Sequence, residues 1–214
     1  MINSTLTSVA ADTVTAVSYP PKVLALDQAL VKSGYAIIDT TNMTISYGQI
    51  EAPLRQGKQV FDYWARVKFV KDTVAGLIQS HNIEQLVLEM PFVSSRQHVS
   101  SGQTLQAVYA AIQILAKDLD LNVDSIPPTQ WPKLLGLKST KLELLDLLRP
   151  MGITTDHQSD AIGLGLAYLI KQQNNYKLDA TVEMSNFIYI NAPLYRLRLS
   201  IPASALPNLP AIIF

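Results

Sequence analysis

Apolar residues along the first ninety positions follow two different periods. Apolar runs at residues 22–27, 34–39 and 43–50 have the length of strands, and Thr41-Asn42 is a turn signal between the second and third. Between residues 58 and 80 the apolar residues recur at helical spacing, which predicts an amphipathic helix. A further strand is predicted at 84–89. The predicted inward face of that helix comprises Val60, Phe61, Trp64, Val67, Val70, Val74, Leu77 and Ile78.

Helices and strands alternate from there to about residue 171. A helix is predicted over about 97–119, and a strand at 121–126 is closed by Pro127-Pro128. Thr129 and Ser139 are candidate N-caps of two short helices, and the last clear helix begins near Asp156. The inward residues of the helix at 97–119 are predicted to be Leu105, Val108, Ile112 and Leu115. The order predicts an α/β layer fold, in which three antiparallel strands continue into parallel strands flanked by helices.

Both ends of the chain differ in character from its middle. Residues 1–20 are rich in Ser and Thr and contain no Lys or Arg, which excludes a secretory signal or transit peptide and predicts a flexible extension. Residues 174–214 contain candidate strands at 181–190 and 194–199, expected to pack on the same domain as a C-terminal β extension. Residues 21–173 are therefore predicted to form the single main domain.

Composition excludes several classes of function. The chain has no cysteine, so it has no disulfide framework, thiolate zinc site or cysteine nucleophile, and a reducing compartment suits it. Its apolar stretches are too short to span a bilayer, so no membrane partner is expected. The formal net charge of zero argues against a general nucleic-acid coat, but phosphates can be met by local patches and a bound metal. The five basic residues between 51 and 71 are interpreted as a solvated helix face.

Acidic residues close two of the predicted strands. Asp27 and Glu89 each follow an apolar run, at the strand ends where ligand sites of open α/β sheets gather. Either acid alone could simply reach solvent or cap a helix. A third group opens the last helix, where His157 and Asp160 are three residues apart and Asp156 is a candidate N-cap. Acids from two strands and a helix suit hard divalent cations, and two such ions can hydrolyse a phosphodiester.

Four short motifs follow one another between residues 22 and about 172. They are Asp27 with Gly34 and Tyr35, Glu89 with Phe92, Ser101-Gly102-Gln103, and His157 with Asp160 and Ala161. In this order they resemble the motifs of the RuvC-type Holliday junction resolvases, a family of the ribonuclease H-like superfamily. Two departures stand out: Gln28 takes the place where the family usually has Pro, and His157 takes the place of an acid, with the extra acid Asp156 just before it.

The resemblance implies a ribonuclease H-like mixed sheet and a set of roles for particular residues. Asp27, Glu89 and Asp160 would be catalytic, metal-binding acids, and His157 the fourth ligand or a proton shuttle; the resemblance leaves open whether His157 or Asp156 serves the metal. The ions would be two Mg²⁺ or Mn²⁺ per active site. Residues expected to contact DNA are Phe92, as a wedge between bases, and Arg96, Lys138 and Lys141.

The function that this resemblance implies is resolution of four-way DNA junctions by a homodimer, in the cytoplasm of a bacterium, as a host or phage-encoded protein, or in another reducing compartment that contains DNA. One alternative is another nuclease of the same fold that acts on RNA or hybrids. A second is a catalytically silent module that binds branched DNA, which Gln28, His157 and the zero net charge favour. An actin-like ATP-binding fold is discounted because the chain lacks Gly-rich phosphate loops.

Overall fold

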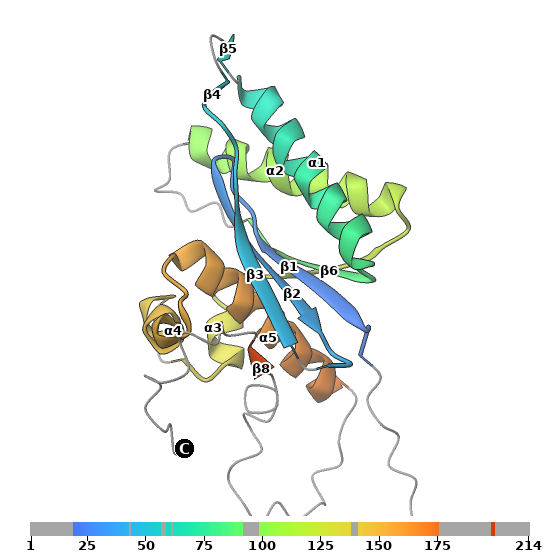
Figure 1. Cartoon of the computed structure of the whole chain (residues 1–214), viewed down its shortest axis with the longest axis vertical. Coiled ribbons are helices and arrows are strands. Elements are labelled where there is room, and N and C mark those ends of the chain that lie inside the picture. The colour runs from blue at the N-terminus through green and yellow to red at the C-terminus, as the bar shows by residue number, and fades with distance from the viewer. Residues whose placement is uncertain are drawn as a thin grey trace, which may run out of the picture.

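A mixed sheet forms the centre of the protein, in the strand order β7-β6-β1-β2-β3-β8 (Figure 1). This computed structural model describes residues 19–42, 44–56, 59–60, 62–91, 99–137, 141–175 and 198–199. The antiparallel strands are β1 (Lys22–Asp27), β2 (Lys32–Asp39) and β3 (Thr44–Glu51). The parallel strands are β6 (Gln85–Glu89) beside β1 and β7 (Asn122–Ile126) beside β6. The predicted fold class is therefore confirmed.

The turn between β2 and β3 is held by Asp39. Its carboxylate accepts hydrogen bonds from the backbone N–H groups of Thr41 and Asn42, each at 3.0 Å. The bond from the Asn42 backbone is the largest cause that lowers the pKa of Asp39. This local side-chain to backbone bonding explains why the Thr41-Asn42 signal predicts the turn correctly.

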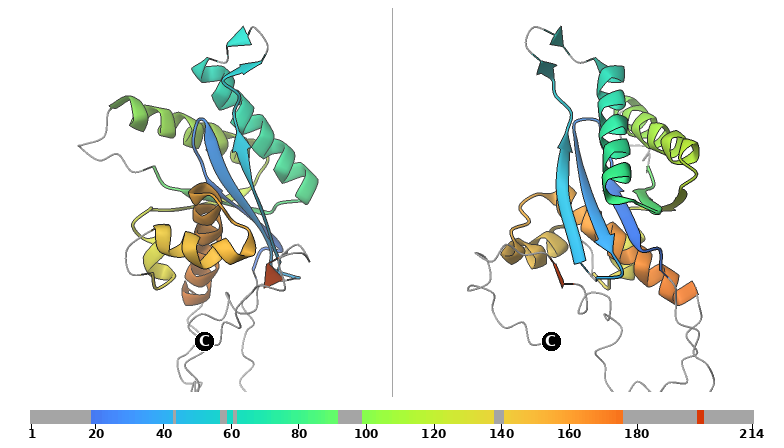
Figure 2. Two further views of the ribbon diagram at one scale, coloured as in Figure 1. Left: turned by 60° about the vertical axis from the view of Figure 1, so that its left-hand side comes forward. Right: turned by 45° about the vertical axis from the view of Figure 1, so that its right-hand side comes forward.

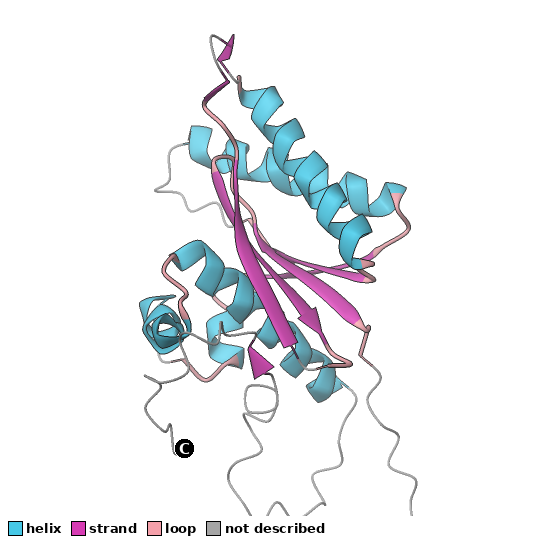
Figure 3. Cartoon of the chain, in the orientation of Figure 1, coloured by secondary structure: helices cyan, strands magenta, loops and turns pink. Residues whose placement is uncertain are grey.

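Two layers of helices cover the two faces of the sheet (Figures 2 and 3). One layer consists of α1 (Tyr63–His81) and α2 (Val99–Asp118). The other consists of α3 (Trp131–Leu134), α4 (Lys141–Leu148), the 3-10 turn η1 (Arg149–Met151) and α5 (Asp156–Asn175). Strand side chains alternate between two hydrophobic cores: Leu24 and Leu26 of β1 face α1 and α2, whereas Val23 and Ala25 face α5.

The start of α1 differs from the prediction. Of the residues predicted as its first turn, Gln59 and Val60 instead form β5 (Gln59–Val60), which pairs with β4 (Arg55–Gln56), and Phe61 lies outside the described residues. The helix begins only after Asp62, whose side chain accepts a hydrogen bond from the Ala65 N–H at 2.7 Å. Trp64, predicted to point inward, is 68% exposed, in the first turn of the helix and three residues before the buried stripe begins at Val67. That stripe consists of Val67, Val70, Val74 and Ile78, as predicted.

The predicted cap of α3 is also wrong. Thr129 was expected to cap it, but α3 begins at Trp131, and Gln130 precedes it without a side-chain cap bond. The backbone carbonyl of Pro127 accepts the N–H groups of Gln130 and Trp131, at 2.9 and 3.3 Å, so the turn after the two prolines starts the helix through the main chain. Ser139, the other candidate cap, lies outside the described residues.

The remaining sequence predictions concern α2 and the two ends. In α2, Val108, Ile112 and Leu115 are buried as predicted, and Leu105 is half-buried. Near the C-terminus, β8 (Arg198–Leu199) pairs in parallel with β3. The predicted extension at 1–20 and the predicted strand at 181–190 fall almost entirely outside the described residues and stay predictions. In the part of the chain that is described, no helix is both long and apolar enough to cross a membrane.

Candidate active site

The two strand-end acids lie on neighbouring parallel strands. The register of β1 and β6 pairs Leu26 with Leu88, so the next residues, Asp27 and Glu89, stand beside each other. Ala25 and Val87, two residues earlier, both belong to the core beneath α5, and alternation along a strand turns the two acids to that same face. Both carboxylates therefore lie at one edge of the sheet, on the side that α3 and α5 cover.

His157 in the first turn of α5 contacts Asp27. Its Nδ1 atom lies 2.7 Å from Asp27 Oδ2, and the Asp27 residue is only 8% exposed. The hydrogen bond with Asp27 is the largest cause that raises the pKa of His157, against the opposing effect of burial. The negative charges of Asp27, Asp156 and Asp160 raise it further. The pair thus favours a protonated imidazole next to a buried carboxylate.

A glycine of β2 allows this contact. Gly34 is the register partner of Asp27, and a Cβ atom placed on it would lie 1.8 Å from the backbone oxygen of His157. The main chain of α5 therefore rests directly on the main chain of β2 at this point. Any side chain at Gly34 would push the first turn of α5, and His157 with it, away from Asp27.

Glu89 is oriented by a tryptophan that the sequence analysis did not single out. Trp131 Nε1 donates a hydrogen bond to Glu89 Oε1 at 2.9 Å, and the indole is completely buried. Register explains the meeting, because Glu89 pairs with Ile126 at the end of β7 and the chain then turns through two prolines into α3. The signal in the sequence is Trp131 itself, which stands five residues after Ile126, the last residue of the strand beside Glu89.

The other acids of α5 have different surroundings. Asp160 is 3% exposed, within a stretch from 159 to 170 in which every residue is buried. Asp156 is exposed and accepts a hydrogen bond from the His157 N–H at 3.0 Å. Asp156 is not the N-cap that we predicted, because it is the first residue of α5 and Thr155 Oγ1 accepts the Gln158 N–H at 3.3 Å. The structure brings His157, rather than Asp156, to Asp27.

The structure does not describe the side chains of the four residues predicted to contact DNA. Phe92, Arg96 and Lys138 lie outside the described residues. Lys141 is the first residue of α4, but its side chain is likewise not among those described. These four assignments stay predictions.

The chemistry of the site suits a hard divalent cation, since carboxylate oxygens and an imidazole are the donors that magnesium or manganese sites use. However, the side chains of the site are arranged in two separate pairs. Asp27 is engaged by His157, and Glu89 by Trp131. Among the described residues, no three His, Asp or Glu side chains are grouped closely enough to hold one metal ion. The donor types fit a metal, whereas a three-ligand cluster would require at least one of these side chains to move.

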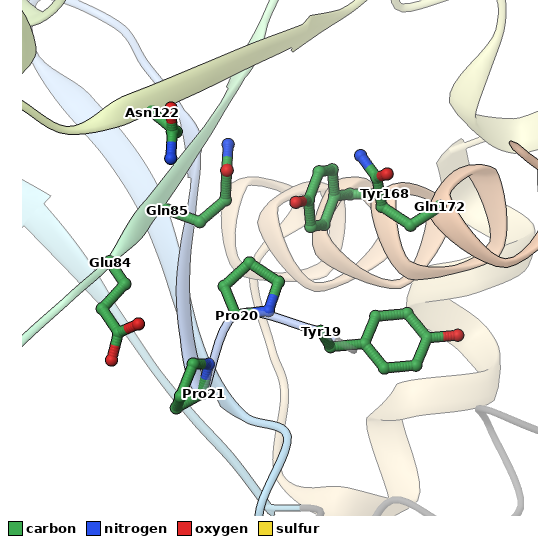
Figure 4. Close-up of a pocket in the computed structure, with 8 residues that line it drawn as sticks. All are labelled: Tyr19, Pro20, Pro21, Glu84, Gln85, Asn122, Tyr168 and Gln172. Carbon is green, nitrogen blue, oxygen red and sulfur yellow. The ribbon is translucent and has the colours of Figure 1, made fainter. Parts of the chain in front are cut away.

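A cavity of about 460 Å³ lies at the opposite end of the sheet (Figure 4). Residues that begin β6 and β7 line it together with the segment that precedes β1 and the second half of α5. The lining residues are Tyr19, Pro20, Pro21, Glu84, Gln85, Asn122, Tyr168 and Gln172. None of the acids described above belongs to this cavity.

Among the comparisons with known proteins, the one with solved structures identifies the fold. No family model and no curated protein matches the sequence. The structure is similar to Thermus thermophilus RuvC in complex with a Holliday junction substrate, with a TM-score of 0.57 and 15% identity over 72% of this chain and 96% of that chain. It is also similar to Thermus thermophilus RuvC in another structure, with a TM-score of 0.56 and 14% identity over 72% and 97%.

A third similar structure is the yeast mitochondrial Holliday junction resolvase Ydc2, with a TM-score of 0.54 and 13% identity over 74% of this chain and 82% of that chain. The likeness thus spans nearly all of the bacterial enzyme and most of the yeast one. At these identities it is a likeness of fold. The chain has the ribonuclease H-like fold of the RuvC-type Holliday junction resolvases.

Proposed function

We propose that this protein is an endonuclease that resolves four-way DNA junctions by metal-dependent hydrolysis of phosphodiester bonds. The observation that carries the proposal is the juxtaposition of Asp27 and Glu89 on adjacent parallel strands, with His157 bound to Asp27, in a resolvase-like fold. A phosphodiester needs a water made nucleophilic and a stabilised leaving oxygen. Divalent ions held by carboxylates supply both.

The residues that would hold the ions are Asp27, Glu89, Asp160 and His157. Bound Mg²⁺ or Mn²⁺, two ions per site, would lower the pKa of the attacking water and stabilise the leaving oxygen. Trp131 would keep the Glu89 carboxylate in place, since it already donates to Glu89 Oε1. His157 would either join the ligands or carry the proton that its Nδ1 atom shares with Asp27 Oδ2.

The similar structures support the proposed substrate. RuvC of Thermus thermophilus was solved with a Holliday junction substrate, and we extend that substrate class to this chain. A four-way junction is resolved by two cuts in symmetric strands, so we propose a homodimer with one active site in each subunit. A two-fold dimer matches the two-fold symmetry of such a junction.

A panel of substrates tests the proposal. The purified protein is incubated with four-way, three-way, flap, linear duplex and RNA–DNA hybrid substrates, each with Mg²⁺, Mn²⁺ or EDTA. We expect paired nicks in the four-way junction, only with a divalent ion, and no cleavage by the Asp27→Asn variant. Cleavage confined to hybrids or RNA would instead assign the protein to another branch of the same fold.

Two observations favour a second candidate, a module that binds branched DNA without cutting it. The described residues contain no ready three-ligand metal cluster, and Gln28 follows the first acid. The same panel separates the two candidates. Tight binding of the four-way junction with no cleavage in Mg²⁺ or Mn²⁺ would identify the silent module.

A further inference from the structure

Gln28 lies at the point where β1 separates from β6. The register of these two strands ends at Leu26 with Leu88, whereas β6 continues to pair with β7 as far as Glu89 with Ile126. The Met90 N–H donates to Ile126 O in β7 at 2.9 Å. Backbone groups alternate sides along a strand, so the carbonyl of the preceding residue, Glu89, faces β1. Beyond the end of β1, that carbonyl needs a donor from elsewhere.

The side chain of Gln28 supplies this donor. Its Nε2 atom donates to Glu89 O at 2.5 Å, and the residue is only 2% exposed. The loop that follows is fixed as well, because Ser33 Oγ, also buried, accepts the Ala29 N–H at 2.9 Å and donates to Ala29 O at 2.8 Å. The amide of Gln28 therefore ties the chain just after Asp27 to the main chain of Glu89.

The oxygen of the Gln28 amide takes no part in this contact. Gln28 Oε1 is enclosed by protein and has no hydrogen-bond partner among the described residues. Burying an amide oxygen without a donor costs free energy, and holding the Glu89 carbonyl requires only the N–H. A buried acceptor that lacks a protein donor suits the O–H of a bound water.

We propose that Gln28 is a positioning residue of the candidate active site. Its Nε2 atom holds the main chain of Glu89 beside Asp27, so that the two carboxylates keep their relative position, and its Oε1 atom accepts a hydrogen bond from a buried water. This inference rests on the proposed function and assigns a task to the residue that replaces the usual Pro of the resolvases. It also predicts that loss of a buried amide impairs metal binding at the end of the sheet where Gln28 lies and not at the opposite end.

The chain offers a matched control. Gln85 is also buried, at 6% exposure, and its Nε2 atom donates to a backbone carbonyl, that of Leu86, at 2.7 Å. Gln85 begins β6 at the opposite end of the strand from Glu89. The substitutions Gln28→Met and Gln85→Met each remove an amide while keeping the length of the side chain.

Three measurements on the full chain test the proposal: stability in urea, Mn²⁺ binding by calorimetry without DNA, and kcat and KM on a four-way junction. We expect Gln28→Met to weaken Mn²⁺ binding and to lower kcat by about tenfold each, with KM unchanged, because residues that orient metal ligands have effects of this size. Gln85→Met should lose similar stability but keep Mn²⁺ affinity and kcat. The proposal is overturned if both variants bind Mn²⁺ as the wild type does.

Two further outcomes are distinguishable. If the wild type binds Mn²⁺ but cuts no substrate, the proposed function fails, while the Mn²⁺ affinities of the two variants still decide the role of Gln28. If the wild type binds no Mn²⁺, both proposals are overturned. Should Gln28→Met not fold, Gln28→Asn keeps an amide that is one methylene too short to reach Glu89 O, and the same loss of Mn²⁺ affinity is expected.

Discussion

The two long helices on opposite faces of the sheet, α1 with 19 residues and α5 with 20, are buried in different ways. In the part of α1 that is described, a stripe of four residues is buried, and the opposite side faces solvent. In α5, every residue from 159 to 170 is buried, because the sheet covers one side and α3 and α4 cover the other. A helix enclosed in this way can bring a charged residue such as Asp160 to the interior.

Their glycines show how each helix is fitted to the sheet. A Cβ on Gly165 of α5 would lie 2.6 Å from Ile38 Cδ1 and 3.1 Å from Ala25 Cβ. A Cβ on Gly76 of α1 would meet none of the described atoms within 4 Å. The backbone of α5 therefore approaches the sheet closely at Gly165, whereas Gly76 is exposed on the outer side of α1, whose buried stripe consists of Val and Ile side chains. Close backbone contact positions His157 and Asp160 more precisely than a layer of flexible side chains would.

The largest effect is expected for Gly34→Ala. The new Cβ would clash with the backbone oxygen of His157, which unlike a side-chain end cannot turn aside. We expect the free energy of unfolding in urea to fall by about 3 kcal/mol or more, at the upper end of overpacking effects, and cleavage to be lost. A Gly34→Ala protein of wild-type stability would mean that α5 does not rest on β2.

The next effect concerns the two acids of α5, one buried and one exposed. Asp160→Asn should lower junction cleavage by on the order of 100-fold, equivalent to about 2.7 kcal/mol of transition-state stabilisation, and leave junction binding nearly unchanged. Asp156→Asn should change the rate by less than about twofold, since Asp156 is exposed and the amide oxygen of Asn can still accept the His157 N–H. Single-turnover rates and gel-shift affinities test both. The opposite result would exchange the roles of these two residues.

Matched glycine substitutions in the two helices test the comparison directly. Gly165→Ala should destabilise the protein by about 1–3 kcal/mol, because Ile38 and Ala25 leave no room for a methyl group. Gly76→Ala should stabilise it by about 0.5–1 kcal/mol, because alanine favours a helix and meets no obstacle. Urea denaturation measures both. A neutral or stabilising effect of Gly165→Ala would contradict the close approach of α5 to the sheet.

A smaller effect is expected from matched tryptophan substitutions. Trp131→Phe keeps most of the buried ring but removes the hydrogen bond to Glu89 Oε1, so stability should fall by about 1–2 kcal/mol and cleavage should fall as well. Trp64→Phe, on the exposed side of α1, should change stability by less than about 0.5 kcal/mol. If Trp131→Phe cleaves at the wild-type rate, the indole does not orient Glu89.

The smallest effect is expected in the pH dependence of stability, and its sign can be predicted. The pKa of His157 is raised in the folded protein, so its bond to Asp27 stabilises fully below the unfolded pKa of about 6.5 and is lost as pH rises through the folded value. In EDTA, the difference in stability between the wild type and His157→Gln should therefore shrink as pH rises. Asp27→Asn should abolish this trend. A difference that grows with pH would contradict the pairing.

Several features of the fold were predictable because they depend on local patterns. The strand period and the Thr41-Asn42 turn signal predict the meander, and an acid that closes an apolar run identifies Asp27 and Glu89 as strand-end residues. Helical spacing likewise locates the buried stripe of α1. Each of these signals lies within about ten residues of chain, where covalent geometry limits the alternatives.

Other features depend on contacts between distant segments and were not predictable. The Glu89 partner Trp131 depends on the register of β7, and the need for a glycine at position 34 depends on the close approach of α5. The same holds for the choice between His157 and Asp156, which the helix rotation decides by turning one to Asp27 and the other to solvent. The sequence by itself determined the candidate residues for the chemistry, and the tertiary structure decided which of them meet, because packing brings together groups as far apart as residues 27 and 157.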